Sequence, residues 1–409
     1  MLNRRTALFL ICIVACGFSV HAQDASSEPE GVLSGFDVLQ RDGFAQLSGG
    51  RVGLITNHTG INRHGESIAK LLQESSQVEL VALFSPEHGF EGTLDQAKIN
   101  DARDDATGLQ IFSLYGKTRR PTAESLSGID VLVFDIQDIG TRFYTYISTM
   151  GGAMRAAAEH GVRFVVLDRP NPIGGSVVQG PVLDEGSESF VGFQRIAVRH
   201  GMTTGELAMM FRDELKLDLD LTVVRMEGWQ RSMMYDATGL LWVNPSPNMR
   251  NLTQAILYPG IGLLETTNLS VGRGTDTPFE VVGAPWIDAV TLARDLNVRG
   301  LPGVRFVPIR FTPESNKYEG ESCGGVNSIV THREAFDPLR TGLTVAVALR
   351  SLYRDDWDTT SLNRLLSSKK TAAGLLSGES VETMQAEYQS ELAAFKQRRL
   401  KYLLYDTAH

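Results

Sequence analysis

The sequence contains few cysteines and no long uncharged apolar segment after its N-terminus. Only three of its 409 residues are cysteine. Cys12 and Cys16 lie in the first apolar segment, so Cys323 is the one thiol in the rest of the chain. A single thiol cannot form an intrachain disulfide, so the hydrophobic core must stabilise the fold, which the chain length allows. A spanning helix needs ~20 apolar residues. We therefore expect no membrane span.

Basic residues are outnumbered by acidic residues. The chain has 39 Lys and Arg against 48 Asp and Glu, which gives a formal net charge of −9. Nucleic acid is therefore an unexpected partner, because its binding depends on neutralising phosphates. The apolar content of 42% and the charged content of 21% exclude collagen-like, coiled-coil and wholly disordered chains. At ~150 residues per domain, the length predicts two domains or three small ones.

Residues 1–22 have the pattern of a secretory signal peptide, with two arginines, an apolar run and a Val20-His21-Ala22 cleavage site. Cleavage there leaves 37 basic against 48 acidic residues, a formal charge of −11. Residues 13–16 also resemble a lipobox, which would place a lipid on Cys16. We expect an exported periplasmic or secreted protein, because the Val-x-Ala site lies at the more ordinary distance from the arginines. A polar tail, 23–31, follows.

Short β-branched runs alternate with helical patterns after this tail. Four runs end in polar or glycine-rich residues: Arg51–Ile55, Val78–Phe84, Val131–Phe134 and Arg163–Leu167. Helical patterns lie between them at Glu66–Glu74 and Ile147–His160, and Gly161 is expected to end the second helix. The alternation predicts a doubly wound, mostly parallel α/β sheet.

The pattern of predicted helices and strands changes near residue 250. Before that point, Thr203-x-x-Glu206 is a capping box that predicts a helix over 205–215, and Leu221–Met226 predicts one more strand. The first domain is therefore expected to span 32–250. The remaining residues, 251–409, predict a smaller α+β domain that completes a cleft. Its expected features are glycine-rich loops, a rigid turn at Tyr258-Pro259-Gly260, a strand at Val304–Phe311, and a final helix with Val381, Met384, Tyr388 and Phe395 on one face.

Several common catalytic motifs are missing. Tyr115-Gly116-Lys117-Thr118 lacks the first glycine of a phosphate-binding loop, because Ile111 stands in its place. No Gly-x-Gly-x-x-Gly opens the first strand-helix unit, which excludes dinucleotide binding of that type. There is also no His-Glu-x-x-His and no Gly-x-Ser-x-Gly, which excludes the common zinc-protease and α/β-hydrolase chemistries.

Polar clusters follow the four apolar runs, where open parallel sheets bind ligands. Glu87, in Ser85-Pro86-Glu87-His88-Gly89, is a candidate general acid or base, and the alternative is a surface loop glutamate. Asp135 and Asp138 could bind sugar hydroxyls or supply a second carboxylate, or could simply end a strand and cap a turn. Tyr144 and Tyr146 could stack on a sugar face or serve only in packing.

The C-terminal half of the sequence contains two further candidate site residues, a glutamate and an arginine. Asn244-Pro245-Ser246-Pro247-Asn248 predicts a rigid turn near the cleft. Glu265 precedes a glycine-rich loop that carries Arg273, and arginine is suited to bidentate capture of a carboxylate. His88 could orient Glu87 or contact the ligand, or could be a structural histidine.

Three of these segments together resemble the NamZ-type exo-β-N-acetylmuramidases, a bacterial family formerly of unknown function. They are residues 84–89, 134–144 and 272–275, and the likeness extends from about Val32 to the C-terminus. The resemblance implies a Rossmann-like N-terminal domain and a smaller C-terminal domain. It also implies a cleft that removes terminal non-reducing β-linked N-acetylmuramic acid from peptidoglycan fragments, in cell-wall turnover and recycling. No metal or organic cofactor is implied.

The resemblance also implies a role for Glu87, and we add expectations for other residues. In the family, the glutamate of the Ser-Pro-Glu-His-Gly loop is the leading catalytic candidate, which makes Glu87 the expected acid. The second carboxylate is expected to be Glu265, Asp135 or Asp138. Arg142 or Arg273 is expected to bind the lactyl carboxylate. The full set of expected substrate contacts is Asn57, His88, Asp138, Arg142, Tyr144, Arg169, Asn248 and Arg273. Retaining, inverting and substrate-assisted mechanisms all stay open.

Two other functions stay open beside the glycosidase. A non-catalytic muropeptide-binding protein would use the same cleft without cleaving the sugar. A secreted esterase or deacetylase is the third candidate, although the sequence contains no nucleophile elbow or metal motif for it. An assay for released sugar distinguishes the glycosidase from the binding protein. The sequence does not indicate an oligomeric state.

Overall fold

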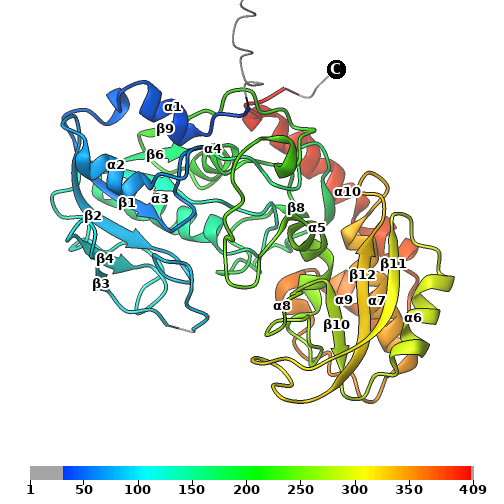
Figure 1. Cartoon of the computed structure of the whole chain (residues 1–409). Coiled ribbons are helices and arrows are strands. Elements are labelled where there is room, and N and C mark those ends of the chain that lie inside the picture. Colours follow the sequence, from blue (N-terminus) through cyan, green and yellow to red (C-terminus); the bar gives the residue numbers. More distant parts are fainter. Residues whose placement is uncertain (1–30, 97, 407–409) are drawn as a thin grey trace, which may run out of the picture.

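The computed structural model describes residues 31–96 and 98–406. The expected signal peptide, the lipobox and nearly all of the polar tail lie outside these described residues. Figure 1 shows two lobes, the first coloured blue to green and the second mainly yellow to orange. Within the described part of the chain, no helix combines the length and apolar character needed to cross a membrane.

A seven-stranded sheet forms the centre of the first lobe, in the order β3-β4-β2-β1-β5-β6-β9. The strands are β1 (Arg51–Thr56), β2 (Glu79–Ser85), β3 (Ala102–Arg103), β4 (Gln110–Ser113), β5 (Val131–Asp135), β6 (Arg163–Leu167) and β9 (Leu221–Val224). All neighbours pair in parallel except β3 and β4. Taken alone, β2-β1-β5-β6-β9 follow the 2-1-3-4-5 order of a doubly wound fold. The predicted fold class is confirmed.

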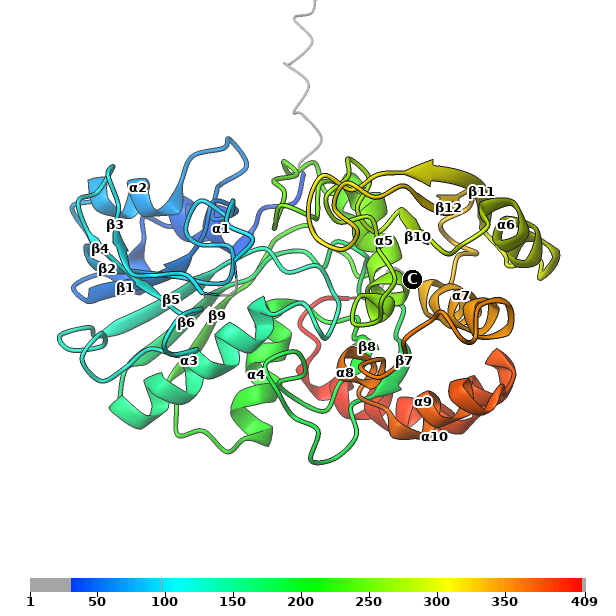
Figure 2. The same cartoon turned by 90° about the horizontal axis from the view of Figure 1, so that it is seen from below.

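Helices cover both faces of this sheet. They are α1 (Gly35–Arg41), α2 (Ile68–Glu74), α3 (Tyr146–His160) and α4 (Thr204–Glu214). Figure 2 shows α1 and α2 on one face and α3 and α4 on the other. Successive side chains of a strand point to opposite faces. Leu54 therefore joins the core under α1 and α2, whereas Ile55 joins the larger core on the α3 side.

The predicted start signal of α4 and the predicted stop signal of α3 are both present in the structure. Thr203 and Glu206 form a reciprocal capping box at the start of α4. Gly161 ends α3 with a φ of 67°, in the left-handed region that glycine adopts easily. Helix α2 begins two residues later than expected, because the backbone N–H of Glu66 donates to Asn62 Oδ1 in the preceding loop.

The second lobe contains a three-stranded antiparallel sheet of order β10-β12-β11. Its elements are α5 (Leu252–Ile261), η3 (Gly262–Leu264), β10 (Val281–Ala284), α6 (Ala289–Val298), β11 (Val304–Phe311), β12 (Cys323–Val330), α7 (Pro338–Leu352), α8 (Asn363–Leu366), α9 (Lys369–Ser377) and α10 (Val381–Arg399). The predicted strand Val304–Phe311 is confirmed, and so is the buried face of the final helix. A two-stranded sheet, β7 (Gln179–Val182) with β8 (Ala197–Arg199), contacts α10.

The segment Tyr258-Pro259-Gly260 is not the turn that was expected, because it lies inside α5. Helices α5 and α7 pack closely at this point. A Cβ atom on Gly260 would lie 1.8 Å from the carbonyl oxygen of Pro338. The glycine therefore allows close helix packing rather than a change of chain direction.

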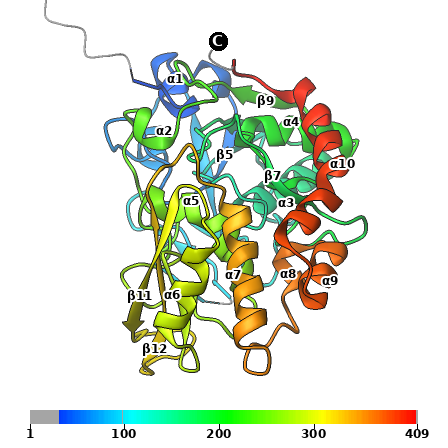
Figure 3. The same ribbon diagram turned by 90° about the vertical axis from the view of Figure 1, so that its right-hand side faces the viewer.

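The C-terminal residues return to the first lobe, and Figure 3 shows α10 running along this side of the molecule toward α4. The Tyr405 hydroxyl donates to Asp168 Oδ2 at 2.6 Å and accepts from the backbone N–H of Met226 at 3.0 Å. The backbone N–H of Leu404 donates to Glu206 Oε1 at 2.8 Å. Buried polar contacts therefore hold the end of the chain on the doubly wound domain.

Candidate active site

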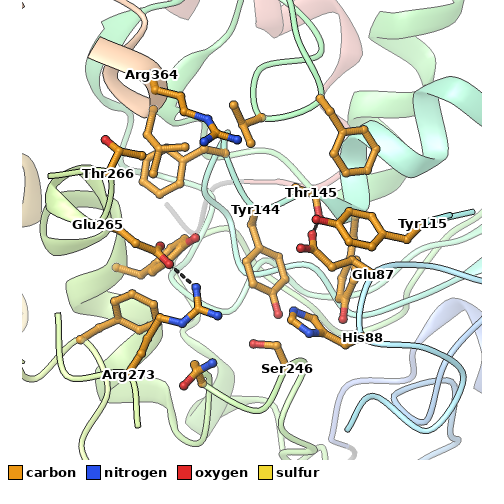
Figure 4. Close-up of a pocket in the computed structure, with 18 of the residues that line it drawn as sticks. Glu87, His88, Tyr115, Tyr144, Thr145, Ser246, Glu265, Thr266, Arg273 and Arg364 are labelled. Atoms are coloured by element: carbon orange, nitrogen blue, oxygen red, sulfur yellow. Dashed lines mark hydrogen bonds and ion pairs between the residues drawn. The ribbon is translucent and has the colours of Figure 1, made fainter. Parts of the chain in front are cut away.

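A cavity of about 450 Å³ lies between the two lobes. Residues that follow β2, β4 and β5 form one wall, and residues near η3, β12 and α8 form the other (Figure 4). Its volume falls within the ~300–1,000 Å³ of typical small-molecule sites. Six of the predicted site residues line it: Glu87, His88, Tyr144, Asn248, Glu265 and Arg273.

Glu87 lies on a tight loop directly after β2. His88 and Gly89 both have left-handed backbones, with φ values of 71° and 79°. This conformation is uncommon for a residue other than glycine and is enriched at functional sites. The loop leaves the Glu87 side chain half-buried against the cavity, where the Thr145 hydroxyl donates to Glu87 Oε2 (Figure 4).

Tyr115 is a second hydroxyl beside Glu87. Burial raises the pKa of Tyr115 to about 12, and the negative charge of nearby Glu87 acts in the same direction. The guanidinium groups of Arg119 and Arg364 oppose this rise. At neutral pH the phenol therefore keeps its proton and stays neutral beside the carboxyl group of Glu87.

His88 is anchored by one of its ring nitrogens. Its Nδ1 donates to the carbonyl oxygen of Leu94 at 2.7 Å. The backbone N–H of Leu94 returns a hydrogen bond of 3.1 Å to the carbonyl of His88. These bonds fix the ring at the cavity wall and leave Nε2 available to a ligand (Figure 4).

Glu265 and Arg273 lie together on the opposite wall (Figure 4). Arg273 Nη1 donates to Glu265 Oε1, and Arg273 Nη2 lies 2.7 Å from both carboxylate oxygens of Asp95. Burial lowers the pKa of Arg273, but the carboxylates of Glu265 and Asp95 have the larger effect and raise it overall. The same contact with Arg273 lowers the pKa of Asp95 against the effect of burial.

Tyrosines that meet edge to face form part of the cavity wall. The ring of Tyr144 lies 5.0 Å from that of Tyr146 and 5.9 Å from that of Tyr258, at angles of 76° and 88°. The Tyr146 hydroxyl donates to the carbonyl of Pro245 at 2.5 Å. These contacts connect the loop after β5 to the predicted rigid turn and orient the aromatic surface.

Asp135 and Arg169 do not reach the cavity. This corrects the expectations that Asp135 is a second catalytic carboxylate and that Arg169 contacts substrate. Their side chains are buried and form a two-pronged ion pair, with Nε to Oδ1 at 2.5 Å and Nη2 to Oδ2 at 2.8 Å. Arg169 Nη2 also donates to the carbonyl of Ile61 at 3.0 Å. Each group satisfies the other's charge in the core, so Asp135 is not available as a second catalytic carboxylate.

Arg142 is fully buried, which corrects its assignment as a binder of the lactyl carboxylate. Its Nη1 donates to the carbonyls of Pro181 and Ile196, and its Nη2 donates to those of Leu365 and Leu366 at 2.9 and 2.7 Å. Burial lowers the pKa of Arg142 to about 9, which still leaves it charged at neutral pH. Arg142 therefore fixes α8 to the first lobe.

Asn57 and Asp138 are also buried outside the cavity, so the expectation of direct substrate contact is corrected for both. Asn57 Nδ2 donates to the Tyr146 hydroxyl at 3.2 Å. Asp138 Oδ2 accepts from the backbone N–H of Gly140 at 2.7 Å and lies 3.7 Å from His200 Nε2. These residues support the cavity wall from behind.

Sequence reasoning missed several cavity residues. Thr145 stands next to a predicted aromatic, but a hydroxyl at that position carries no signal of its own. Tyr115 and Arg119 follow β4, a strand that the sequence analysis did not predict. Arg364 lies on α8, a helix of only four residues. Lys317, which donates to the backbone carbonyl of Glu265, lies in a loop without a motif.

Known proteins match both lobes of this chain. A family model described as "Exo-beta-N-acetylmuramidase NamZ, N-terminal" matches residues 52–253, and its C-terminal counterpart matches residues 256–405. The peptidoglycan beta-N-acetylmuramidase NamZ of Bacillus subtilis (strain 168) is 44% identical over 397 residues, which cover 96% of each chain.

Two crystal structures of DUF1343 family proteins from Bacteroides fragilis NCTC 9343 have the same fold. One has a TM-score of 0.86 at 39% identity and covers 91% of this chain and 99% of its own. The other has a TM-score of 0.75 at 32% identity and covers 92% and 99%. The likeness therefore includes both lobes.

Proposed function

We propose that this chain, which belongs to the NamZ family of exo-β-N-acetylmuramidases, releases terminal non-reducing β-linked N-acetylmuramic acid from peptidoglycan fragments. It is accordingly a glycoside hydrolase of peptidoglycan turnover. Likeness to a peptidoglycan β-N-acetylmuramidase along almost the whole chain supports the activity. The observation that carries the catalytic assignment is the half-buried carboxyl of Glu87, held by a hydroxyl at the edge of the cavity.

Glu87 acts as the general acid in this proposal. Thr145 holds Oε2, which leaves the other carboxyl oxygen for the glycosidic oxygen of the substrate. The carboxyl gives its proton to that oxygen as the bond from C1 breaks. A water molecule then adds its hydroxyl to C1 and passes its remaining proton to a carboxylate, either Glu265 or the ionised Glu87. A positioned acid of this kind contributes ~10²–10⁴ in rate.

Glu265 is the proposed second carboxylate. In the described part of the chain, it is the one acidic residue besides Glu87 that lines the cavity, and it faces Glu87 from the other wall (Figure 4). Arg273 serves as its counter-ion. The anomer that is released first, identified by proton NMR, distinguishes an inverting from a retaining reaction, and the 2-acetamido group can itself serve as nucleophile in the retaining case.

An assay of sugar release from a chromogenic β-N-acetylmuraminide and from muramic-acid-terminated glycan fragments tests the function. A glycosidase releases free N-acetylmuramic acid from the non-reducing end. A non-catalytic muropeptide-binding protein would bind these fragments and release nothing. Release of acetate or of an ester-linked group without sugar would indicate the esterase or deacetylase alternative.

Export of the chain is a further part of the proposal, and the signal-peptide pattern of residues 1–22 supports it. Mass spectrometry of the protein isolated from its native host gives the mature N-terminus. We expect Gln23 at that position, in the periplasm or the medium. A diacylated Cys16 would show instead that the chain is a lipoprotein.

A further inference from the structure

The substrate named in the proposed function carries a charge that decides where it can bind. N-acetylmuramic acid differs from N-acetylglucosamine by a lactyl ether that ends in a carboxylate. In the described part of the chain, four arginine or lysine side chains line the cavity: Arg119, Arg273, Lys317 and Arg364. On the basis of the proposed function, one of these cations must be free to bind that carboxylate.

The positive charge near Arg273 is already balanced. Arg273 contacts the carboxylates of both Glu265 and Asp95. Lys317 donates to the backbone carbonyl of Glu265, and burial lowers the pKa of Lys317. Two cations and two carboxylates give this group a formal charge of zero. A substrate carboxylate at Arg273 would have to displace an existing partner, which reduces its net gain.

Arg119 and Arg364 carry unbalanced charge. Within the residues that the structure describes, neither guanidinium forms an ion pair. Arg119 stacks on aromatic rings, with its Cζ 4.2 Å from the ring centre of Phe190 and 5.1 Å from that of Tyr115. Stacking of this kind fixes the plane of the guanidinium and leaves its N–H edge free for a carboxylate.

Both free cations lie near the proposed acid. Arg119 and Arg364 line the same cavity as Glu87, and each acts on the pKa of Tyr115, as the charge of Glu87 does. Figure 4 shows Arg364 directed into the cavity on the side away from Arg273. A carboxylate bound there would keep the sugar between Glu87 and the aromatic wall.

The helix that carries Arg364 is fixed in place. Arg142 binds the carbonyls of Leu365 and Leu366 at the end of α8, and Asn363 Oδ1 accepts from the backbone N–H of Ser368 at 2.9 Å. These bonds hold the backbone of the exposed Arg364 before any ligand arrives. A preorganised backbone reduces the ordering cost of binding.

We propose that Arg364, assisted by Arg119, binds the lactyl carboxylate of N-acetylmuramic acid and so determines the preference for this sugar over N-acetylglucosamine. Arg273 instead serves as the counter-ion of Glu265. Arg142 acts on recognition only by holding α8.

Steady-state kinetics with two chromogenic substrates test this assignment. One substrate is the β-N-acetylmuraminide with a free lactyl acid, and the other is its neutral lactyl methylamide. We expect the wild-type enzyme to prefer the acid, and we expect Arg364→Met to raise KM for the acid by roughly 10–150-fold, the range of one charge-assisted hydrogen bond. The kcat for the acid and the kcat/KM for the amide should stay unchanged, because only ground-state and transition-state binding of the carboxylate is lost.

Arg120→Met is the matched control, because Arg120 neighbours Arg119 but pairs with Glu159 at the surface. This control should keep the wild-type preference, whereas Arg119→Met should lose part of it. Equal kcat/KM of the wild-type enzyme for the acid and the amide would overturn the proposal. Full preference in both Arg364→Met and Arg119→Met, with loss in Arg273→Met, would also overturn it.

A binding measurement separates failure of this inference from failure of the proposed function. Titration calorimetry compares free N-acetylmuramic acid with N-acetylglucosamine on the wild-type protein and on Arg364→Met. We expect tighter binding of the acidic sugar, and loss of that difference in the variant, whether or not the protein hydrolyses a substrate. Absence of sugar release with this binding pattern would reject the glycosidase alone, and equal binding of both sugars would reject the arginine assignment.

Discussion

At the scale of the residue, Glu87 depends on the hydroxyls beside it. Thr145 donates to its carboxylate from the loop after β5, and Tyr115 lies beside it on the loop after β4. Both loops follow strands of the sheet, so the geometry of the acid is set by rigid elements. A carboxyl without these contacts would sample several rotamers and would protonate the substrate less often.

The hydroxyl of Thr145 can be removed at almost constant volume. We expect Thr145→Val to lower kcat by roughly 10–150-fold with little change in KM, because Glu87 becomes negatively charged as it gives up its proton and a hydrogen bond to a charged group contributes ~1.5–3 kcal/mol. Thr145→Ser keeps the hydroxyl and serves as the control, which should retain most of the activity. Equal loss in both variants would show that the methyl packing of Thr145 matters and not its hydrogen bond.

Asp168 makes stability depend on pH. Its carboxyl is buried, and burial raises the pKa to about 6, although hydrogen bonds from Tyr405, Gly205 and Thr203 oppose the rise. The unfolded value is ~3.9. Between these two pH values the folded state binds more protons than the unfolded state. The Asp168 contribution to the free energy of unfolding therefore falls as pH rises from ~4 to ~6 and is constant above that range.

Urea unfolding of the wild-type protein and of Asp168→Asn between pH 4 and 8 measures this effect. We expect the stability of the wild type, relative to that of the variant, to increase as pH falls from 7 to 4. The variant has no carboxyl to titrate at this position. A constant difference between the two proteins across this range would contradict the assignment.

At the scale of the element, hydrophobic pattern and capping signals predicted the strands and helices that position Glu87. Strands β1, β2, β5 and β6 are continuous apolar runs, which is what burial on both faces of a parallel sheet requires. Strand β4 is short and lies near the sheet edge, so its four residues carry no such run. The cavity residues that follow it were missed for that reason.

The candidate site was predicted only in part, because a polar motif does not show which way a side chain points. Glu87 and Glu265 face the cavity, whereas Asp135 and Arg142, in an equally polar motif, are buried on internal partners. Arg364 approaches from a distant part of the chain. Contacts of this kind depend on tertiary packing and have no local sequence pattern.

Because α5 packs closely on α7, we expect an alanine at position 260 to destabilise the protein, which is the reverse of the usual effect in a helix. Alanine in place of a helical glycine normally stabilises a helix by ~1 kcal/mol. Here the added Cβ would lie 1.8 Å from the Pro338 carbonyl oxygen, so Gly260→Ala should instead lower the free energy of unfolding by ~1–3 kcal/mol. The urea midpoint at unchanged m-value measures the change. A higher midpoint would show that the helices can separate without cost.

At the scale of the whole molecule, the two lobes make one site. The first lobe supplies the proposed acid from a doubly wound sheet, and the second supplies Glu265, Arg273 and Arg364. The final segment crosses back and is held by Asp168 and Glu206, so the lobes are connected at more than one place. This arrangement places a local excess of positive charge in the cavity of a chain with a net charge of −9.

The most direct test of the central claim is the rate of N-acetylmuramic acid release by Glu87→Gln, compared with the wild-type protein at the same temperature and pH. The glutamine keeps the shape of the side chain but cannot donate the acidic proton. We predict a fall in kcat of ~10²–10⁴, with unfolding temperature and affinity for N-acetylmuramic acid nearly unchanged. A folded variant that keeps more than about a tenth of the wild-type rate would contradict the assignment of Glu87 as the acid.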